Sequence, residues 1–306
     1  MNDPKGISVS ATRSSHGERT LGGHAGSQQG LLQKAWVRLR RRPGAMFGAI
    51  VIIFFVIIAI FAPVVAPMNP LEISQNRRAF PSSEHLFGTD ELGRDVLSRV
   101  IYGAQISLRV GLVAIGIALT VGTLLGVTAA YAGGWADGVI MRLTDIMLAF
   151  PGILLAIAII SILGPSLFNV MIAVGIESIP AYVRTARAST LSVKEMEYVV
   201  GARALGASTV RILIRYVLPN ISAPLIVLST VGVAGSILAA AGLSFLGLGA
   251  QAPTPEWGAM LSSSRNFLRE AWWMATFPGV AIMLVVLALN LFGDGLRDIL
   301  DPRTRA

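Results

Sequence analysis

The sequence predicts an all-α integral membrane protein with about six transmembrane helices. Of its 306 residues, 54% are hydrophobic and only 14% are charged, whereas a soluble domain usually carries about 25% charged residues. Six apolar runs are long enough to cross roughly 30 Å of bilayer hydrocarbon, which takes about 20 residues. Strand periodicity is absent, so a transmembrane β-barrel is not expected. The runs lie near 45–66, 106–131, 141–163, 167–188, 221–247 and 272–293.

The distribution of arginine and lysine predicts the orientation of these spans. A cluster of arginines precedes the first run, and the positive-inside rule keeps such a cluster in the cytoplasm. Six crossings then place both termini in the cytoplasm. The net charge of +8 follows from this topology, and no nucleic acid partner is expected. The residues placed inside are Arg38, Arg40, Arg41, Arg42, Arg184, Arg187, Lys194, Arg203, Arg211, Arg215, Arg297, Arg303 and Arg305.

The two ends of the chain are expected to be tails. Residues 1–34 are rich in glycine, serine and threonine and lack the apolar core of a signal peptide, so we expect a disordered cytoplasmic tail. The N-terminal transmembrane helix is expected over 35–66, and residues 295–306 form a cytoplasmic C-terminal tail. The chain has no cysteine, and its three histidines are scattered, so no metal cofactor is expected. They are His16, His24 and His85.

Two segments outside the membrane have distinct content. In the periplasmic segment 67–105, Thr89 or Asp90 is a candidate cap for a short amphipathic helix. The apolar face of that helix consists of Leu92, Val96, Leu97, Val100 and Ile101. Residues 248–271 contain Q-A-P-T-P-E-W-G, which combines turn residues with a tryptophan suited to the membrane interface.

The basic segment 184–219 lies between two spans and is too polar to cross the bilayer. Apolar and small residues recur in it at helical spacing, and Gly206 is placed to end a first helix. Ser208 is placed to cap a second helix that runs to Leu218, and Pro219 begins the next element. Two short helices with a glycine turn form a compact unit that can dock into a groove of a partner. The plainer alternative is a loop whose arginines only determine topology.

This segment resembles the coupling loop of bacterial ABC importer permeases, the EAA motif. In that motif a Glu-Ala-Ala triplet is followed by three residues, a glycine, nine residues, and then an apolar residue, any residue, Leu and Pro. Here the glycine is Gly206 and Tyr216 takes the apolar position. The triplet is Val200-Gly201-Ala202, so its acidic residue is missing, and Glu197 is the candidate substitute one turn earlier. The resemblance assigns contact with an ATPase to Glu197, Val200, Gly201, Ala202, Gly206, Ala207, Leu218 and Pro219.

Further motifs narrow the resemblance to permeases for dipeptides, oligopeptides, nickel and glutathione. It covers about 35–306, and the extra first span resembles the C-type subunit of these importers. The matching residues of the periplasmic motif are Gly88, Thr89, Asp90, Gly93, Arg94 and Asp95. Other matches are Met141–Asp145 with Phe150-Pro151, Leu243–Gly249, Pro255–Gly258, Gly293–Asp298 and Asp301-Pro302.

The resemblance implies a type I ABC importer permease fold, with a core over 106–294 and a coupling loop over 190–219. It also implies a multi-pass protein of the bacterial inner membrane. The implied partners are a second permease subunit, two cytoplasmic ATPase subunits and a periplasmic or lipid-anchored substrate-binding protein. No Walker motif occurs in the sequence, so ATP and magnesium would bind the partner ATPases and this chain would not be an enzyme.

Two acidic residues lie within or near spans, where acids mark functional sites by default. Asp145 follows Arg142 by one turn at a cytoplasmic end of a span, so either an i, i+3 ion pair or snorkelling to the interface accounts for it. Glu177 lies deeper and is interpreted either as lining the translocation path or as capping a broken helix. Di- or oligopeptides, including glutathione, are the expected substrates, with nickel as the alternative. Two other classes stay open, namely a secondary transporter and a membrane scaffold.

Overall fold

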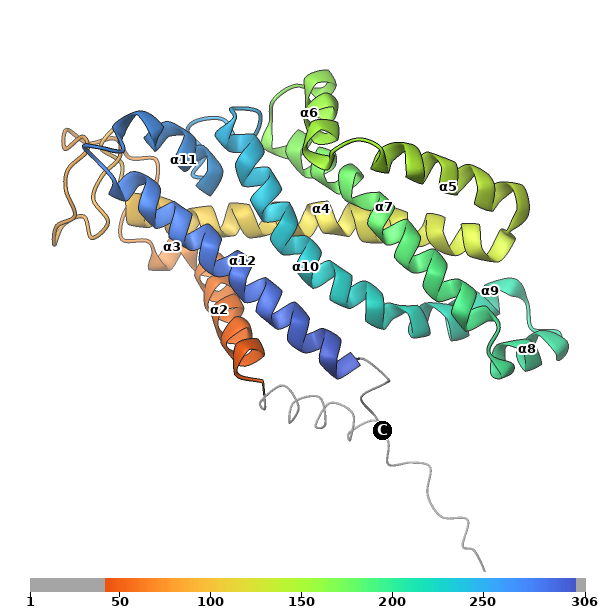
Figure 1. Cartoon of the computed structure of the whole chain (residues 1–306). Coiled ribbons are helices and arrows are strands. Elements are labelled where there is room, and N and C mark those ends of the chain that lie inside the picture. The colour runs from red at the N-terminus through yellow and green to blue at the C-terminus, as the bar shows by residue number, and fades with distance from the viewer. Residues whose placement is uncertain (1–41, 301–306) are drawn as a thin grey trace, which may run out of the picture.

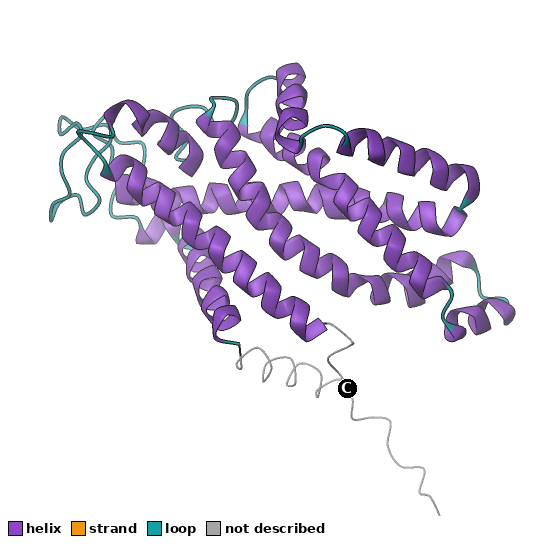
Figure 2. Cartoon of the chain, in the orientation of Figure 1, coloured by secondary structure: helices purple, strands orange, loops and turns teal. Residues whose placement is uncertain are grey.

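The computed structural model describes residues 42–300, and the regular secondary structure of this part of the chain is helical apart from one isolated β-bridge between Thr89 and Asp95, with loops joining the helices (Figures 1 and 2). Several sequence predictions fall outside the described residues. They concern the tail 1–34 with His16 and His24, residues 35–41 of the first span with Arg38, Arg40 and Arg41, and the end of the C-terminal tail with Arg303 and Arg305.

Five helices are long and apolar enough to cross a membrane, which confirms most of the predicted spans. Each has at least 18 residues and few charges in its apolar window. The fourth of them continues a shorter helical stretch that begins at Thr209. The five are α2 (Pro43–Ile60), α4 (Val96–Ala132), α7 (Leu167–Lys194), α10 (Leu218–Phe245) and α12 (Trp273–Leu300).

The predicted span over 141–163 is not one straight helix. The structure divides it between α5 (Gly134–Leu148) and α6 (Gly152–Leu163), which meet at 94°. Pro151 lies at the break, with ψ of 128°. Proline has no N–H to donate to the preceding turn and disfavours the helical conformation of the residue before it, so the helix ends there. The helices α5 and α6 make a sixth span if the bent pair is counted as one unit.

The predicted short helix on the outer segment does not exist as a separate element. Instead α4 begins at Val96 and continues for 37 residues, about 55 Å at 1.5 Å per residue. No proline interrupts residues 96–132, so nothing ends the helix where the apolar span begins. Its N-cap is Asp95, whose side chain accepts a hydrogen bond from the backbone N–H of Ser98, rather than Thr89 or Asp90.

The long helix α4 contacts all the other membrane-length helices, α2, α7, α10 and α12, and its most extensive contact is with α7 (Figure 1). Small residues allow the two backbones to approach closely. A Cβ atom added at Gly126 would lie 2.5 Å from the carbonyl oxygen of Val183, and one at Gly122 would lie 2.5 Å from the Cβ of Tyr182. This packing through glycine is typical of membrane helices.

The start of α2 and the end of α12 lie at the same end of the bundle. Arg42 and Asp298 form an ion pair of 2.8 Å. Gly48 packs against the backbone of α12, where an added Cβ would lie 2.5 Å from the carbonyl oxygen of Ala288. These contacts join the first span to the last one, although the two spans are far apart in the sequence.

The shorter elements lie at the two ends of the bundle (Figure 1). The loop over 66–95 and the helix α11 lie at one end, and α8 and α9 lie at the other. The bounds are α3 (Ala62–Val65), α8 (Glu197–Ala204), α9 (Thr209–Ile212), a π-helix (Leu213–Val217), α11 (Trp257–Ser264) and a 3₁₀ turn (Arg265–Phe267).

Candidate functional site: a coupling loop and a buried polar cluster

The segment predicted to be a coupling loop, residues 190–219 and called the coupling loop below, has the helix α8 in its first half, which ends in a Schellman motif. Gly206 has a φ of +79°, a conformation that glycine adopts without strain. Its N–H donates to the carbonyl of Arg203, and the N–H of Ala207 donates to the carbonyl of Ala202. Both bonds satisfy carbonyls that the end of a helix otherwise leaves free. The predicted helix end at Gly206 is therefore confirmed.

The second half begins at Ser208, as the sequence predicted, but only its first turn is α-helical and the rest is a π-helix that leads into α10. The hydroxyl of Ser208 accepts a hydrogen bond from the N–H of Arg211 and caps α9. The chain then passes through the π-helix into α10 without a break at Leu218-Pro219. The N–H of Leu218 donates to the carbonyl of Leu213, five residues earlier. Pro219 is tolerated because it stands in the first turn of α10, and the predicted start of the next element at Pro219 lies within one residue of the observed start at Leu218.

Buried side chains attach the coupling loop to the bundle. Val199, Ile212 and Val217 are fully buried in the main hydrophobic core. The rings of Tyr198 and Tyr216 lie 6.0 Å apart and join the two halves of the loop. Because both halves are anchored, a force on the loop would be transmitted to α7 and α10 rather than absorbed by a slack connection.

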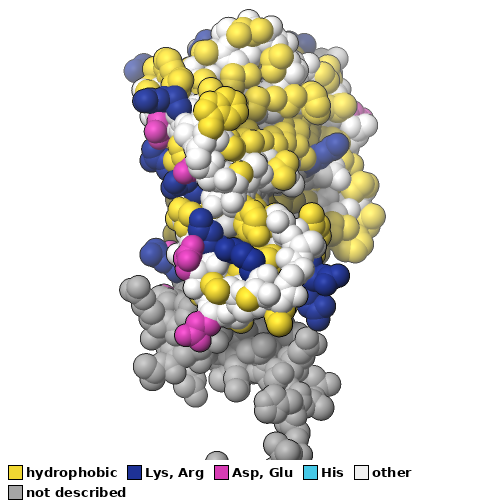
Figure 3. Space-filling model, turned by 90° about the vertical axis from the view of Figure 1, so that its right-hand side faces the viewer, with side chains coloured by type: hydrophobic (Ala, Val, Ile, Leu, Met, Phe, Trp, Pro, Cys, Tyr) yellow, Lys and Arg dark blue, Asp and Glu magenta, His cyan; other side chains and the backbone are white. Residues whose placement is uncertain are grey.

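The outward face of the coupling loop is apolar with basic residues around it. Leu205 is 90% exposed and Val200 is 47% exposed, and Val210 and Ile214 are also exposed. Seen from the side on which α8 and α9 lie, hydrophobic side chains stand among arginine and lysine side chains (Figure 3). Exposed apolar patches with a polar border are typical of interaction sites. Of the other predicted residues, Glu197, Gly201, Gly206, Leu218 and Pro219 are exposed, and Ala202 and Ala207 are partly buried.

A network of charged side chains, the polar cluster (Asp90, Glu91, Arg94 and Arg99), lies at the opposite end of the bundle. The Nε of Arg94 donates to Asp90 Oδ2 at 2.6 Å, and its Nη2 donates to Glu91 Oε1 at 3.0 Å. Arg99 lies 3.4 Å from the same Asp90 oxygen and donates to the carbonyl of Pro70. Both arginines are only 4% exposed, and buried charges of this kind persist because they are paired.

The remaining residues of the motif over 88–95, which was predicted to be periplasmic, fold the segment around this cluster. Asp95 accepts hydrogen bonds from the N–H and the hydroxyl of Ser98, and its other oxygen lies 3.0 Å from Nδ1 of His85. Gly88 has a φ of +72° and Gly93 a φ of +82°, so both positions favour glycine. The six motif residues thus form one folded segment.

One tryptophan joins this segment to α12, and a second joins α11 to α4. The indole N–H of Trp273 donates to the carbonyl of Thr89, and that of Trp257 donates to the carbonyl of Val100. Glu256, beside Trp257, is 2% exposed and caps α11 by accepting from the N–H groups of Gly258 and Ala259. Burial raises the pKa of the Glu256 carboxyl above its usual value. The motif match located this residue, but nothing in the sequence indicated that it is buried.

Two ion pairs join α5 to α7, and neither was predicted. Arg187 binds both carboxylate oxygens of Asp137 at 2.6 Å, and Arg184 lies 2.7 Å from Asp145. The predicted partner of Asp145, Arg142, was therefore wrong. The intrahelical spacing of Arg142 permitted a pair, but α7 runs beside α5 and brings Arg184 to the carboxylate.

Glu177 lies at the bend between α5 and α6. Its carboxylate is next to Gly152, the first residue of α6, where an added Cβ would overlap it. Ser178 donates a hydrogen bond to the other oxygen at 3.2 Å. A helix N-terminus favours a negative charge, so the location suits the interpretation of Glu177 as a cap for a broken helix.

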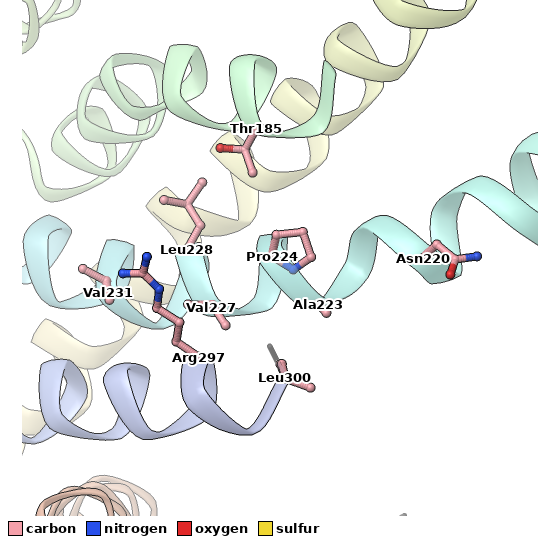
Figure 4. Close-up of a pocket in the computed structure, with 9 residues that line it drawn as sticks. All are labelled: Thr185, Asn220, Ala223, Pro224, Val227, Leu228, Val231, Arg297 and Leu300. Carbon is pink, nitrogen blue, oxygen red and sulfur yellow. The ribbon is translucent and has the colours of Figure 1, made fainter. Parts of the chain in front are cut away.

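A cavity of about 630 Å³ opens between α7, α10 and α12 on the side of the coupling loop. Arg297 reaches from α12 toward Val227 and Val231 on α10, and Thr185 lies across from them on α7 (Figure 4). Arg297 forms no ion pair within residues 42–300. The cavity is otherwise largely apolar. No group of three or more histidine, aspartate or glutamate side chains in the described part of the chain is arranged to hold a metal ion.

Comparison with known families and proteins gives consistent matches. Residues 122–306 match the family of binding-protein-dependent transport system inner membrane components, and residues 30–81 match the N-terminal TM domain of oligopeptide transport permease C. The chain is 50% identical over 275 residues to a dipeptide transport system permease protein, DppC, of Alkalihalophilus pseudofirmus, and the alignment covers 90% of each chain. It is 49% identical to a glutathione transport system permease protein, GsiD, of Escherichia coli over 272 residues, 88% of this chain and 90% of the relative.

Two further comparisons agree. A di/tripeptide transport system permease protein, DppC, of Pseudomonas aeruginosa is 48% identical over 90% of this chain and 93% of its own length. Among solved structures, an inward-facing MetNI methionine ABC transporter chain aligns with a TM-score of 0.54 at 18% identity, over 65% of this chain and 95% of that chain. This likeness concerns the fold. The chain belongs to the binding-protein-dependent transport system inner membrane components and is a multi-pass permease of the bacterial inner membrane.

Proposed function

We propose that this chain is one of two permease subunits of an ATP-driven importer for short peptides. The observation that carries the proposal is the coupling loop, a compact unit anchored in the core with an exposed apolar and basic face. The names of relatives about 50% identical to this chain supply the substrate class, dipeptides, di/tripeptides or glutathione.

In the proposed mechanism both termini and the coupling loop lie in the cytoplasm. A substrate-binding protein delivers the peptide to the outer face, which includes the segment around the polar cluster. The peptide crosses between this chain and a second permease. Two cytoplasmic ATPases bind ATP and magnesium, and each ATPase binds the coupling loop of one permease subunit. When ATP draws the ATPases together, the loops move with them, and α7 and α10 rock between two states.

We assign Glu177 to the wall of this path. It is partly buried beside the bend of α5 and α6 and lies within a span, where carboxylates face a protein interior or a water-filled cavity. The same carboxylate stabilises the start of α6, so both roles fit one position.

The test is reconstitution of the complete complex in lipid vesicles. The expected result is ATP hydrolysis that is stimulated by the loaded binding protein and coupled to peptide uptake. Uptake driven by a proton gradient without ATP would replace the proposal with a secondary transporter. Binding of an ATPase without any uptake would replace it with a scaffold. Mass spectrometry of the ligand held by the purified binding protein identifies the substrate, and nickel in place of a peptide would refute the substrate class.

Gly206→Pro is expected to uncouple ATP hydrolysis from transport without preventing membrane insertion. Proline requires a φ near −65° and has no N–H, whereas Gly206 has a φ of +79° and donates to Arg203. The turn between α8 and α9 therefore cannot form. Gly138→Ala is the matched control, because Gly138 is helical, lies in α5 outside the coupling loop, and no atom lies within 4 Å of an added Cβ. Peptide imported per ATP is the measurement, and a parental ratio for Gly206→Pro would refute the coupling role.

A further inference from the structure

The π-helix Leu213–Val217 joins α9 to α10 at the end of the bundle where α8 lies (Figure 1). With its neighbours it makes one continuous helical stretch over Thr209–Phe245. This stretch has 37 residues, about 55 Å at 1.5 Å per residue, whereas the hydrocarbon of a bilayer is roughly 30 Å thick. A membrane around α10 therefore leaves the first turns of the stretch outside the hydrocarbon, next to α8.

The extra residue of the π-helix changes which side chains face the core. Ile212 and Val217 are five positions apart, and their exposures are only 1% and 0%. In an α-helix, side chains five positions apart point about 140° away from each other. The π-helix, whose hydrogen bonds join residues five apart, brings both to one side. The next buried residues, Ile221 and Leu225, follow at the ordinary spacing of four.

Pro219 accounts for the π-helix at this point of the chain. Proline has no N–H for the carbonyl of Arg215, four residues earlier, and its ring crowds that carbonyl. The helix adapts through the N–H of Leu218, which donates to the carbonyl five residues before it. The side-chain amide of Asn220 donates to the carbonyl of Tyr216 at 2.6 Å. Local π-helical geometry of this kind is how membrane helices accommodate proline.

The residues between the two buried positions face outward. Ile214 is 62% exposed, and Arg215 beside it is exposed as well. Buried residues three or four positions apart in an α-helix leave two or three residues between them, whereas Ile212 and Val217 leave four. The π-helix therefore adds one outward residue, and an apolar side chain stands next to a guanidinium group.

The charged side chains of α9 and the π-helix are both arginines. Arg211 and Arg215 are exposed, and neither forms an ion pair within residues 42–300. By contrast, Arg184 and Arg187 on α7 are paired with aspartates of α5. Two guanidinium groups without a carboxylate, beside an exposed isoleucine, are complementary to a surface that carries carboxylates next to an apolar patch.

The distance from the membrane favours a protein surface over anionic lipid. The predicted span begins at residue 221, so Arg215 precedes it by six residues, roughly 9 Å along the helix. The polar layer on each side of the hydrocarbon is only about 5–8 Å thick. Ile214 and Arg215 therefore lie beyond the lipid headgroups, at the level where a cytoplasmic partner would meet α8.

We propose that Ile214 and Arg215 form a second contact with the partner ATPase, separate from α8, and that the ATPase surface there carries a carboxylate beside an apolar patch. The inference rests on the proposed function, which supplies the ATPase. The resemblance to the EAA motif assigned no contact to either residue. The π-helix positions this contact, because it turns both side chains outward while Ile212 and Val217 stay in the core.

The first test maps the contact in the complete complex in lipid vesicles. The photo-crosslinking residue p-benzoylphenylalanine replaces Ile214, and the products are mapped by mass spectrometry. The expected product joins position 214 to an ATPase segment that contains aspartate or glutamate. Leu238 is the matched control site, because it is 56% exposed on the same helix but lies within the span, and it should give no ATPase product. A complex that couples uptake to ATP yet gives no ATPase product from position 214 would overturn the inference.

Arg215→Glu tests the charge of the contact. We expect the ATPase to bind the variant about tenfold more weakly than the parent, the effect of losing one hydrogen bond between charged groups. The difference should shrink in about 1 M salt, where the Debye length is about 3 Å. Arg142→Glu is the matched control, since Arg142 is exposed on α5 outside the coupling loop. Equal affinity of the parent and Arg215→Glu at low salt would contradict the proposed contact.

Deletion of Ile214 tests the π-helix itself. Without this residue Ile212 and Val217 are four positions apart, so an ordinary α-helix keeps both in the core. We expect a Tm close to that of the parent and an affinity for the ATPase that is lower by about tenfold, as for Arg215→Glu. Parental affinity would show that the extra residue does not position the contact, and a much lower Tm would contradict the register described above.

Three further outcomes separate this inference from its alternatives. If Arg215→Glu binds the ATPase normally but its transport comes to depend on the anionic phospholipid content of the vesicles, the arginine binds lipid and the inference is wrong. If the parental complex couples uptake to ATP and neither variant changes ATPase binding, only this inference fails. If the parental permease binds no ATPase and takes up no peptide with ATP, the proposed function fails as well.

Discussion

The carboxylate of Glu256 is both buried and the cap of a helix. It is 2% exposed, and it accepts hydrogen bonds from two backbone N–H groups at the start of α11. Replacing a capping side chain with alanine costs about 1 kcal/mol. We expect Glu256→Ala to lower the Tm of the purified chain by several degrees, while Glu72→Ala, at an exposed site, leaves it unchanged. An unchanged Tm for Glu256→Ala would contradict the capping role.

The raised pKa of Glu256 also predicts a pH dependence. A carboxyl whose pKa is higher in the folded state contributes stability below its unfolded pKa, near 4.5, and loses that contribution as the pH rises through the folded value. Glutamine does not titrate, so it is the reference. The Tm of the parent relative to Glu256→Gln should therefore rise when the pH is lowered from about 7 to about 5. A difference in Tm that is constant across this range would contradict the burial of a titrating group.

Val200 stands where related coupling loops are expected to have glutamate. It is 47% exposed on α8, close in sequence to the more exposed Leu205. Burial therefore does not explain why this position has valine in place of a charged glutamate. In the proposed complex we therefore expect Val200 to make an apolar contact with the ATPase.

At the scale of elements, the contact between α4 and α7 depends on glycine. A methyl group at position 126 would meet the carbonyl of Val183 at 2.5 Å and the Cβ of Ala186 at 2.8 Å. Overpacking of this kind costs about 1–3 kcal/mol. We expect Gly126→Ala to lower the Tm, whereas Gly116→Ala on the same helix should not, because no atom lies within 4 Å of its added Cβ. Equal Tm values for the two variants would show that the helices do not meet as described.

At the scale of the whole molecule, the orientation in the membrane can be read with single cysteines, because the chain has none of its own. Ile73 is 62% exposed at one end of the bundle, and Leu205 is 90% exposed at the other. In intact cells a membrane-impermeant maleimide should label Ile73→Cys and not Leu205→Cys. After permeabilisation both should be labelled. Labelling of Leu205→Cys in intact cells would reverse the proposed orientation.

The sequence by itself determined features that depend on neighbouring residues. The apolar runs predicted the spans, because transfer of about 20 apolar residues from water is a local property. Gly206 predicted the end of the first short helix and Ser208 predicted the start of the second, because caps are made by residues within one turn. The same applies to the family motifs, which are contiguous in the chain.

Only the tertiary structure decided which distant groups meet. The sequence predicted one span over 141–163, and only the structure revealed the break at Pro151 and its angle of 94°, with α5 packed on α4 and α7 and α6 packed on α7. Asp145 pairs with Arg184 and not with Arg142. Glu91 and Arg94 line a cavity together with residues that follow more than 150 positions later in the chain. The physical reason is that ion pairs and cavities depend on which helices lie side by side. That arrangement is determined by close contacts such as Gly126 with Val183, which no local pattern in the sequence contains.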